Sequence, residues 1–308
     1  MTLFPVFEVD RSLAQNLEQL GTKRKFWFPR EGVSAEWLFK AEERNTGEDW
    51  AEKIACELCA RLGIPHVYYE LAIELPTMTP GVICSNLATP PKRLELGNQL
   101  LSEWNLSYPK DDDKKYGVRQ HTIDAVANVI RKIESPPPAF CGNLPSGVET
   151  AIDVFAGYLM LDAFIANQDR HHQNWGIIRE KTASLAPTFD HGAALARNEP
   201  DEKRERRLHG PDRQYSVENF AAKARSSLYA SETDARTLGT MDAFVAFAQF
   251  CPKAGQAWLQ RLSLLKKEDI ETIVARVPAQ RMSEIAKDFT IQLLLVNQKR
   301  LLETEFAR

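Results

Sequence analysis

The N-terminal part of the chain combines short apolar runs with one amphipathic repeat. Residues 23–40 hold two apolar runs separated by Pro29-Arg30-Glu31-Gly32, a pattern that predicts two strands joined by a turn. Over residues 47–62 apolar side chains recur at every fourth position and share one face, which predicts a helix. Strand-like runs follow over residues 67–75 and 81–87. The predicted order is therefore strand, strand, helix, strand, strand.

Helical patterns dominate the rest of the chain. Residues 94–104 and 122–133 are predicted to be helices, and residues 148–167 form a densely apolar helix that is expected to be buried. Residues 216–306 are again helical in pattern. The polar stretch 197–213 is predicted to be a solvated, mobile loop, with a substrate loop that orders on binding as the alternative.

This order predicts an α+β fold with two lobes. A small lobe with an antiparallel sheet is expected over residues 1–88, and a larger, mostly helical lobe over residues 89–308. The join is expected near Ser85 to Thr89. Because ligands prefer the clefts between such lobes, the functional site is expected there.

Composition narrows the classes of function. The 308 residues are 44% hydrophobic and 26% charged, which is typical of a soluble globular protein. The net charge of -3 gives no basic field for nucleic acid. No apolar stretch approaches the roughly 18–20 residues that span a bilayer, and the N-terminus lacks the pattern of a signal peptide. The chain is therefore expected to be cytoplasmic, without membrane or direct nucleic-acid binding.

Two of the five cysteines, Cys56 and Cys59, form a CxxC motif. They lie within the predicted helix over 47–62, and no second CxxC or His pair follows at zinc spacing. Free cysteine is among the most buried residue types, so both are predicted to be core thiols rather than metal ligands.

The main chemical signal follows the buried helix. Asp169 and Asn174 stand in D-x-x-x-x-N spacing, and Asp190 opens a D-x-G sequence after a short predicted strand. Enzymes that transfer the γ-phosphoryl group of ATP use this spacing for a base and for metal ligands. Mg²⁺ takes oxygen ligands, which Asn174 and Asp190 supply, while Asp169 accepts the proton of the acceptor. The two motifs together predict phosphoryl transfer with ATP and Mg²⁺, against the alternative that both aspartates are turn formers.

An upstream lysine and glutamate complete such a site. Lys40 ends a strand-like run shortly before the helix over 47–62, where a kinase places its lysine against the ATP phosphates. Its partner is expected on that helix: Glu52 is favoured, with Glu57 and Glu48 as alternatives. Taken alone, Lys40 is better explained as an ordinary lysine at the edge of a sheet.

Two further sets of residues each have two possible functions. Gly21-Thr22-Lys23 lies just before the first predicted strand and is either a phosphate-binding loop or a cationic turn. His171, His172 and His191 flank the two motifs. They are predicted to orient the side chains of these motifs rather than to bind zinc, and His172 is also assigned to the nucleotide site.

Several stretches carry a family resemblance. The most specific is Asn167-Gln168-Asp169-Arg170-His171-His172-Gln173-Asn174-Trp175-Gly176. The others are Trp37 to Lys40, Gly47 to Ala55, Leu62 to Pro65, Gly97 to Leu101 and Pro187 to Gly192. Together they resemble the HipA-like kinases, bacterial serine/threonine kinases that include persistence toxins.

This resemblance implies a bilobal, protein-kinase-like fold with ATP in the cleft. It implies that Asp169 is the catalytic base, that Asn174 and Asp190 hold Mg²⁺, and that Lys40 contacts the ATP phosphates. It also places Ser85-Asn86-Leu87 near the adenine-binding hinge. A protein substrate is expected, and an antitoxin partner is compatible with the resemblance.

Three functions stay open on the sequence. The leading hypothesis is an ATP-dependent protein serine/threonine kinase, and the length of residues 193–213 favours a protein acceptor. A small-molecule or lipid kinase uses the same Asp, Asn and Asp set, since a fold does not fix the acceptor. A pseudokinase that binds partners without catalysis is the third, and the complete set of Lys40, Asp169, Asn174 and Asp190 argues against it.

Overall fold

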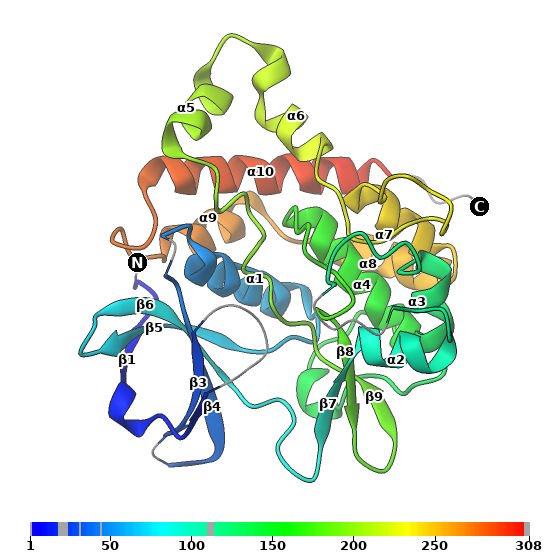
Figure 1. Cartoon of the computed structure of the whole chain (residues 1–308). Coiled ribbons are helices and arrows are strands. Elements are labelled where there is room, and N and C mark those ends of the chain that lie inside the picture. The colour runs from blue at the N-terminus through cyan, green and yellow to red at the C-terminus, as the bar shows by residue number, and fades with distance from the viewer. Residues whose placement is uncertain (1, 18–23, 31, 44, 110–113, 305–308) are drawn as a thin grey trace.

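The computed structural model in Figure 1 describes residues 2–17, 24–30, 32–43, 45–109 and 114–304. These residues form a strand-rich lobe at the N-terminus and a larger helical lobe, so the predicted α+β, two-lobed fold is confirmed. Within the described residues, no helix has the length and apolar character needed to cross a membrane.

The small lobe is built on a six-stranded sheet with the order β1-β5-β6-β4-β3-β2. The four predicted strands are present as β3 to β6, and they pair antiparallel with one another. An unpredicted strand, β1, adds one parallel pair with β5 at an edge, so the sheet is not purely antiparallel. The strands are β1 (Val6–Asp10), β2 (Asn16–Leu17), β3 (Lys25–Arg30), β4 (Val33–Ala41), β5 (Tyr69–Leu75) and β6 (Thr79–Ser85).

Strand β4 lies between two apolar clusters, and its alternation sets the direction of the Lys40 side chain. Leu38 packs in the main core with Ile54 of helix α1 (Glu48–Leu62), whereas Phe39 packs in a second cluster on the other face of the sheet. Because successive side chains of a strand point to opposite faces, Lys40 shares the face of Leu38. The alternation of β4 therefore directs the lysine toward α1.

The larger lobe is organised around α4 (Ala151–Phe164), which is buried along nearly its whole length as predicted. Its Gly157 lies against Trp258, because a Cβ at that position would stand 2.4 Å from the indole. Phe155 of α4 and Ile54 of α1 belong to the same apolar core, so the two lobes share packing. Helix α4 ends directly before the segment with the D-x-x-x-x-N spacing.

The other elements of the larger lobe include a second sheet of three strands, with the order β7-β8-β9. Its strands and helices are β7 (Arg93–Leu96), α2 (Gly97–Trp104), α3 (Ile123–Ile130), β8 (Gly176–Arg179), β9 (Ala183–Leu185), α5 (Asp201–His209), α6 (Val217–Ala222), α7 (Thr240–Ala248), α8 (Pro252–Ser263), α9 (Lys267–Ala275) and α10 (Glu284–Leu302). Short 3₁₀ turns occupy Arg11–Leu13, Pro138–Phe140 and Arg213–Tyr215.

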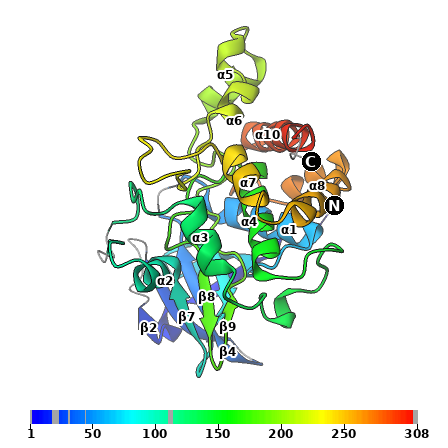
Figure 2. The ribbon, with the colours of Figure 1, turned by 90° about the vertical axis from the view of Figure 1, so that its right-hand side faces the viewer.

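Two predictions are wrong in detail. The helix expected over 94–104 begins only at Gly97, because the preceding residues form β7 and pair with β8. The loop expected over 197–213 contains α5, whose acidic first turn and basic last turn complement the helix dipole. Arg204 of α5 is buried and donates to the carbonyls of Ala196 and Arg197 at 3.2 and 3.0 Å. In Figures 1 and 2, α5 and α6 project from the rest of the larger lobe.

Candidate active site

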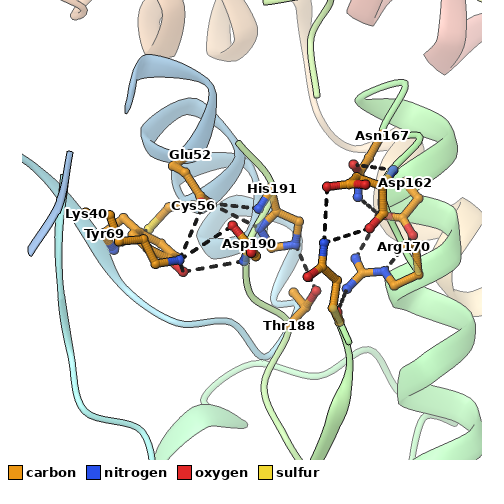
Figure 3. A network of polar contacts seen from close by, with 12 residues as sticks. Lys40, Glu52, Cys56, Tyr69, Asp162, Asn167, Arg170, Thr188, Asp190 and His191 are labelled. Atoms are coloured by element: carbon orange, nitrogen blue, oxygen red, sulfur yellow. Dashed lines mark hydrogen bonds and ion pairs between the residues drawn. The ribbon is translucent and has the colours of Figure 1, made fainter. Parts of the chain in front are cut away.

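Lys40 lies at the centre of a cluster that joins the two lobes (Figure 3). Its Nζ is 3.7 Å from Oε1 of Glu52 on α1 and 3.6 Å from Oδ1 of Asp190, which follows β9. It also donates a hydrogen bond of 3.1 Å to the hydroxyl of Tyr69 on β5. Of the three glutamates considered from the sequence, Glu52 is the one beside Lys40, because Glu57 pairs with Lys53 and Glu48 with Arg197.

The lysine is held in its charged form. Burial alone would lower the pKa of Lys40, but the carboxylate of Asp190, the Tyr69 hydroxyl and the carboxylate of Glu52 together raise the pKa well above its ordinary value of 10.5. The cavity at this cluster is lined by Lys40, Glu52, Asp190 and Gly192, among others.

The segment from Thr188 to Gly192 is fixed from the small lobe. The backbone nitrogen of His191 donates to Oε2 of Glu52 at 2.8 Å, and its Nε2 lies 2.8 Å from Oγ1 of Thr188. Burial lowers the pKa of His191 well below 6.5, so the imidazole is neutral. Asp190 adopts the left-handed region with φ +60°, which turns the chain sharply at this carboxylate.

Asp169 and Asn174 lie in one short loop after α4, as their spacing predicts. Nδ2 of Asn174 donates to the carbonyl of Asp169 at 2.7 Å and lies 3.4 Å from Oδ2 of the same residue. The amide oxygen of Asn174 is therefore the group turned away from Asp169. The side chain of Asp169 is 25% exposed, so an acceptor can reach its carboxylate.

A buried ion pair holds this loop in shape. Arg170 donates from Nε and Nη2 to both carboxylate oxygens of Asp162 at 2.8 and 2.7 Å, and from Nη1 to the carbonyl of Asn174 at 2.9 Å. Asn167 donates to the same Asp162 carboxylate at 2.7 Å. Sequence reasoning missed Asp162, because it lies inside the apolar helix. The available signal is the carboxylate of Asp162 within an apolar run, with Arg170 eight residues later.

In Figure 3, Asp190 and His191 lie between the Lys40–Glu52 pair and the Asp162–Arg170 pair. The charge of Asp190 also acts on His171, which lies in the loop after α4. The carboxylate of Asp190 acts to raise the pKa of His171, which burial nevertheless lowers to about 4. The two sequence motifs are thus brought together with the upstream lysine, and Asp190 is the member that faces both sides.

The histidines have separate environments. His171 accepts a hydrogen bond of 3.1 Å from the backbone nitrogen of Gln173 at Nδ1, which leaves its proton on Nε2, 3.8 Å from Oδ1 of Asp169. His172 instead lies in the interior of the larger lobe, where its Nδ1 is 2.7 Å from the hydroxyl of Tyr108. The described residues contain no group of three His, Cys, Asp or Glu that could hold a metal ion. Cys56 and Cys59 are buried thiols, as predicted.

The remaining predicted residues lie at the edges of the site. Ser85 ends β6 and is paired with Trp37, and the backbone nitrogen of Asn86 donates to the carbonyl of Glu36 at 3.0 Å. Leu87 packs against the main core. These three residues form the start of the segment that connects the two lobes. Gly21-Thr22-Lys23 lies outside the described residues.

One residue that the sequence did not single out contacts the predicted base directly. The hydroxyl of Tyr116 donates to Oδ1 of Asp169, and its ring meets that of His171 edge to face at 5.3 Å between centroids. Tyr116 belongs to the connection between α2 and α3, far from Asp169 in the chain, so no local pattern could have revealed the contact.

Solved structures of other proteins share this fold, and two of them are compared with this chain. The Helicobacter pylori proinflammatory kinase CtkA matches with a TM-score of 0.73 and 20% identity, over 98% of this chain and 100% of that one. The HipA of Shewanella oneidensis MR-1, solved with HipB and its operator DNA, matches with a TM-score of 0.55 and 11% identity, over 94% of this chain and 67% of that one. No protein-family model and no curated protein matches the sequence. The comparisons therefore establish a HipA-like kinase fold.

Proposed function

We propose that the chain is an ATP- and Mg²⁺-dependent kinase that phosphorylates serine or threonine hydroxyls of a protein. The observation that carries the proposal is the convergence of Glu52 and Asp190, from separate elements, on Nζ of Lys40 at 3.7 and 3.6 Å. The fold supports it, because solved chains that share the fold include one described as a kinase and one described as HipA.

Lys40 is proposed to bind the phosphates of ATP. Its raised pKa keeps it charged at any physiological pH, and Glu52 fixes its direction, the arrangement that kinases use between a strand lysine and a helix glutamate. The connection formed by Ser85-Asn86-Leu87 is proposed to border the adenine, since it crosses between the lobes at the end of β6.

Asn174 and Asp190 are proposed to hold Mg²⁺. Their donor atoms fit this ion, because Mg²⁺ prefers carboxylate and amide oxygens and keeps several positions for phosphates and water. The side chain of Asp190 is 32% exposed and its carboxylate lies beside the lysine that would contact the same phosphates. When bound, Mg²⁺ neutralises phosphate charge that develops during transfer.

Asp169 is proposed to act as the base. The hydroxyl oxygen of the acceptor attacks the γ-phosphorus, the bond to the bridging oxygen breaks, ADP leaves, and the hydroxyl proton passes to the Asp169 carboxylate. Asn174 anchors the Asp169 backbone, while Arg170 holds the loop on α4 through Asp162. These contacts keep the base in place before the acceptor arrives.

A protein acceptor is proposed because the side chain of Asp169 is 25% exposed, so a segment of another protein can reach it. The HipA structure was solved with HipB, and on that likeness an antitoxin-like partner is proposed for this chain as well. Co-purification of a small protein with the tagged chain from its native host checks the second point.

Transfer of label from γ-labelled ATP tests the function. The wild type is incubated with Mg²⁺, labelled ATP and a mixture of soluble proteins, beside Asp169→Ala and the control Asp288→Ala, which removes an exposed carboxylate on α10. The proposal predicts labelled serine and threonine with the wild type and control, and none with Asp169→Ala. Equal labelling by Asp169→Ala, or none by any protein, contradicts it. Label on small molecules alone favours a small-molecule kinase.

A further inference from the structure

Tyr116 holds the position in which an acceptor hydroxyl is expected. Its hydroxyl donates to Oδ1 of Asp169, the contact that a substrate hydroxyl makes with a catalytic base before transfer. The Tyr116 side chain is not part of an apolar core, since the residue is 61% exposed. Within the described part of the chain, the phenol makes one directed polar contact, and this contact explains its position better than packing does.

The chain around Tyr116 is anchored on the loop that carries Asp169. Two residues on, Val118 is buried, and the backbone nitrogen of His121 donates to the Val118 carbonyl at 3.0 Å. Nε2 of His121 in turn accepts from the indole nitrogen of Trp175 at 3.1 Å, and Trp175 directly follows Asn174. The Tyr116 backbone is thus tied to the same piece of structure as the base, which keeps the two ends of the contact together.

The Tyr116 ring has an aromatic neighbour and an adjacent cavity. The His171 ring meets the Tyr116 ring edge to face, a favoured geometry for aromatic pairs. Beside them lies a cavity of about 240 Å³, lined by Tyr116, Gln168, Arg225 and Ser227 among others. Gly117, with φ +69° and open space around it, follows the tyrosine directly and permits the turn of the chain away from the base.

The hydroxyl is in the protonated form that the reaction needs. Partial burial, and then the hydrogen bond to Asp169, raise the pKa of Tyr116 above its ordinary value of 10, so the phenol keeps its proton until a base removes it. Asp169 is that base in the proposed function.

We propose that Tyr116 is an intramolecular phosphoacceptor of this kinase. The proposal rests on the function proposed above, because it uses the same base and the same ATP. Proximity explains why a tyrosine is modified by an enzyme that otherwise acts on serine or threonine, since a group already placed at the base needs no binding step.

The reaction balances without any further reactant. The Tyr116 oxygen attacks the γ-phosphorus of ATP, the bond between that phosphorus and the bridging oxygen breaks, and ADP leaves. The phenolic proton passes to Asp169 and then to solvent. The phosphotyrosine carries close to two negative charges at neutral pH, so it is repelled by the Asp169 carboxylate and leaves the base. Modification therefore makes Oδ1 of Asp169 accessible to a second acceptor.

Intact-mass analysis and phosphopeptide mapping after incubation with Mg²⁺ and ATP test the proposal. One phosphate on Tyr116 is expected, at a rate per molecule that does not change with protein concentration. Tyr116→Phe loses this label. Tyr68→Phe keeps it, although the Tyr68 hydroxyl also donates to a carboxylate, that of Glu70. In a mixture with active enzyme, the inactive Lys40→Met protein stays unlabelled at Tyr116, because transfer is within one molecule.

Casein added to the wild-type reaction separates the two proposals. Phosphate on casein with an unmodified Tyr116 overturns the tyrosine proposal and leaves the kinase function standing. Phosphate on Tyr116 of the Lys40→Met protein in the mixture overturns the intramolecular route. Absence of phosphate from both casein and Tyr116 overturns the tyrosine proposal together with the proposed function.

Discussion

Glu52 on helix α1 accepts a hydrogen bond of 2.8 Å from the backbone nitrogen of His191. This contact joins the small lobe to the segment that carries Asp190, and the other oxygen of the same carboxylate faces Lys40 at 3.7 Å. One glutamate therefore couples the direction of the lysine to the position of the proposed metal ligand.

Replacement of Glu52 by Gln is expected to weaken ATP binding about tenfold, which corresponds to about 1.4 kcal/mol. The amide keeps an acceptor for His191 but removes the charge beside Lys40, so the lysine is drawn to Asp190 instead of the phosphates. Calorimetry of ATP binding in Mg²⁺ measures the change. Glu57→Gln, which alters the Lys53 pair on the same helix, is the matched control and is expected to bind ATP like the wild type. Equal affinities for both variants contradict the role of Glu52.

Asp169→Asn is expected to lower the rate of phosphoryl transfer by about 10²–10⁴, the usual contribution of a positioned base. ATP affinity is expected to stay close to that of the wild type, since Asp169 is assigned to the acceptor and not to the nucleotide. Single-turnover transfer and ATP titration separate the two effects. A variant that loses ATP binding while retaining the transfer rate shows that Asp169 has been assigned the wrong role.

Asp162→Ala is expected to destabilise the fold by about 3–5 kcal/mol, because it leaves the buried Arg170 without its carboxylate partner. Urea unfolding of the wild type and variant measures the free energy of unfolding. Glu271→Ala breaks the surface pair with Lys267, which has both partners exposed, and is expected to change stability little. If the two variants unfold at the same urea concentration, the Asp162–Arg170 pair does not support the loop.

Three buried histidines predict that stability falls in acid. Burial lowers the pKa of His121 to about 3 and of His171 to about 4, and it lowers the pKa of His191 well below 6.5. Between the unfolded value of 6.5 and these folded values, only the unfolded chain binds the protons, so the free energy of unfolding decreases as pH falls. Each histidine contributes a slope of at most about 1.4 kcal/mol per pH unit.

Urea unfolding of the wild type and His121→Asn across this pH range checks the sign and the source of the effect. The variant is expected to show a shallower loss of stability toward acid, since one proton-binding group of the unfolded chain is gone. His209→Asn removes an exposed histidine from the end of α5 and is expected to keep the wild-type slope. A wild-type slope in His121→Asn contradicts the assignment of a neutral, buried His121.

The sequence predicted those parts of the fold and site that short-range spacing specifies. The period of α1 and the alternation of β4 are local, and together they determine that Lys40 and Glu52 face each other. The spacing between Asp169 and Asn174 is likewise local, because both belong to a single loop. The functional roles of these residues stay predictions until they are measured.

What the sequence missed depends on contacts between distant segments. β1 is defined by its parallel pairing with β5, and its mostly exposed residues give no strong apolar signal of their own. The sequence predicts a loop where α5 forms, because the residues of α5 are almost all charged, although Arg204 is buried and donates to a carbonyl upstream. The contact between Tyr116 and Asp169 joins two loops, and periodicity carries no information about such a pair.

Lys40, Asn174 and Asp190 are proposed to form one site for ATP with Mg²⁺, and calorimetric titration of ATP into the wild type and Asp190→Asn examines this site. The wild type is expected to bind ATP more tightly with Mg²⁺ than with EDTA, and Asp190→Asn is expected to lose this gain from the metal. Binding of ATP that is equal with and without Mg²⁺, or equal in the wild type and Asp190→Asn, would contradict it.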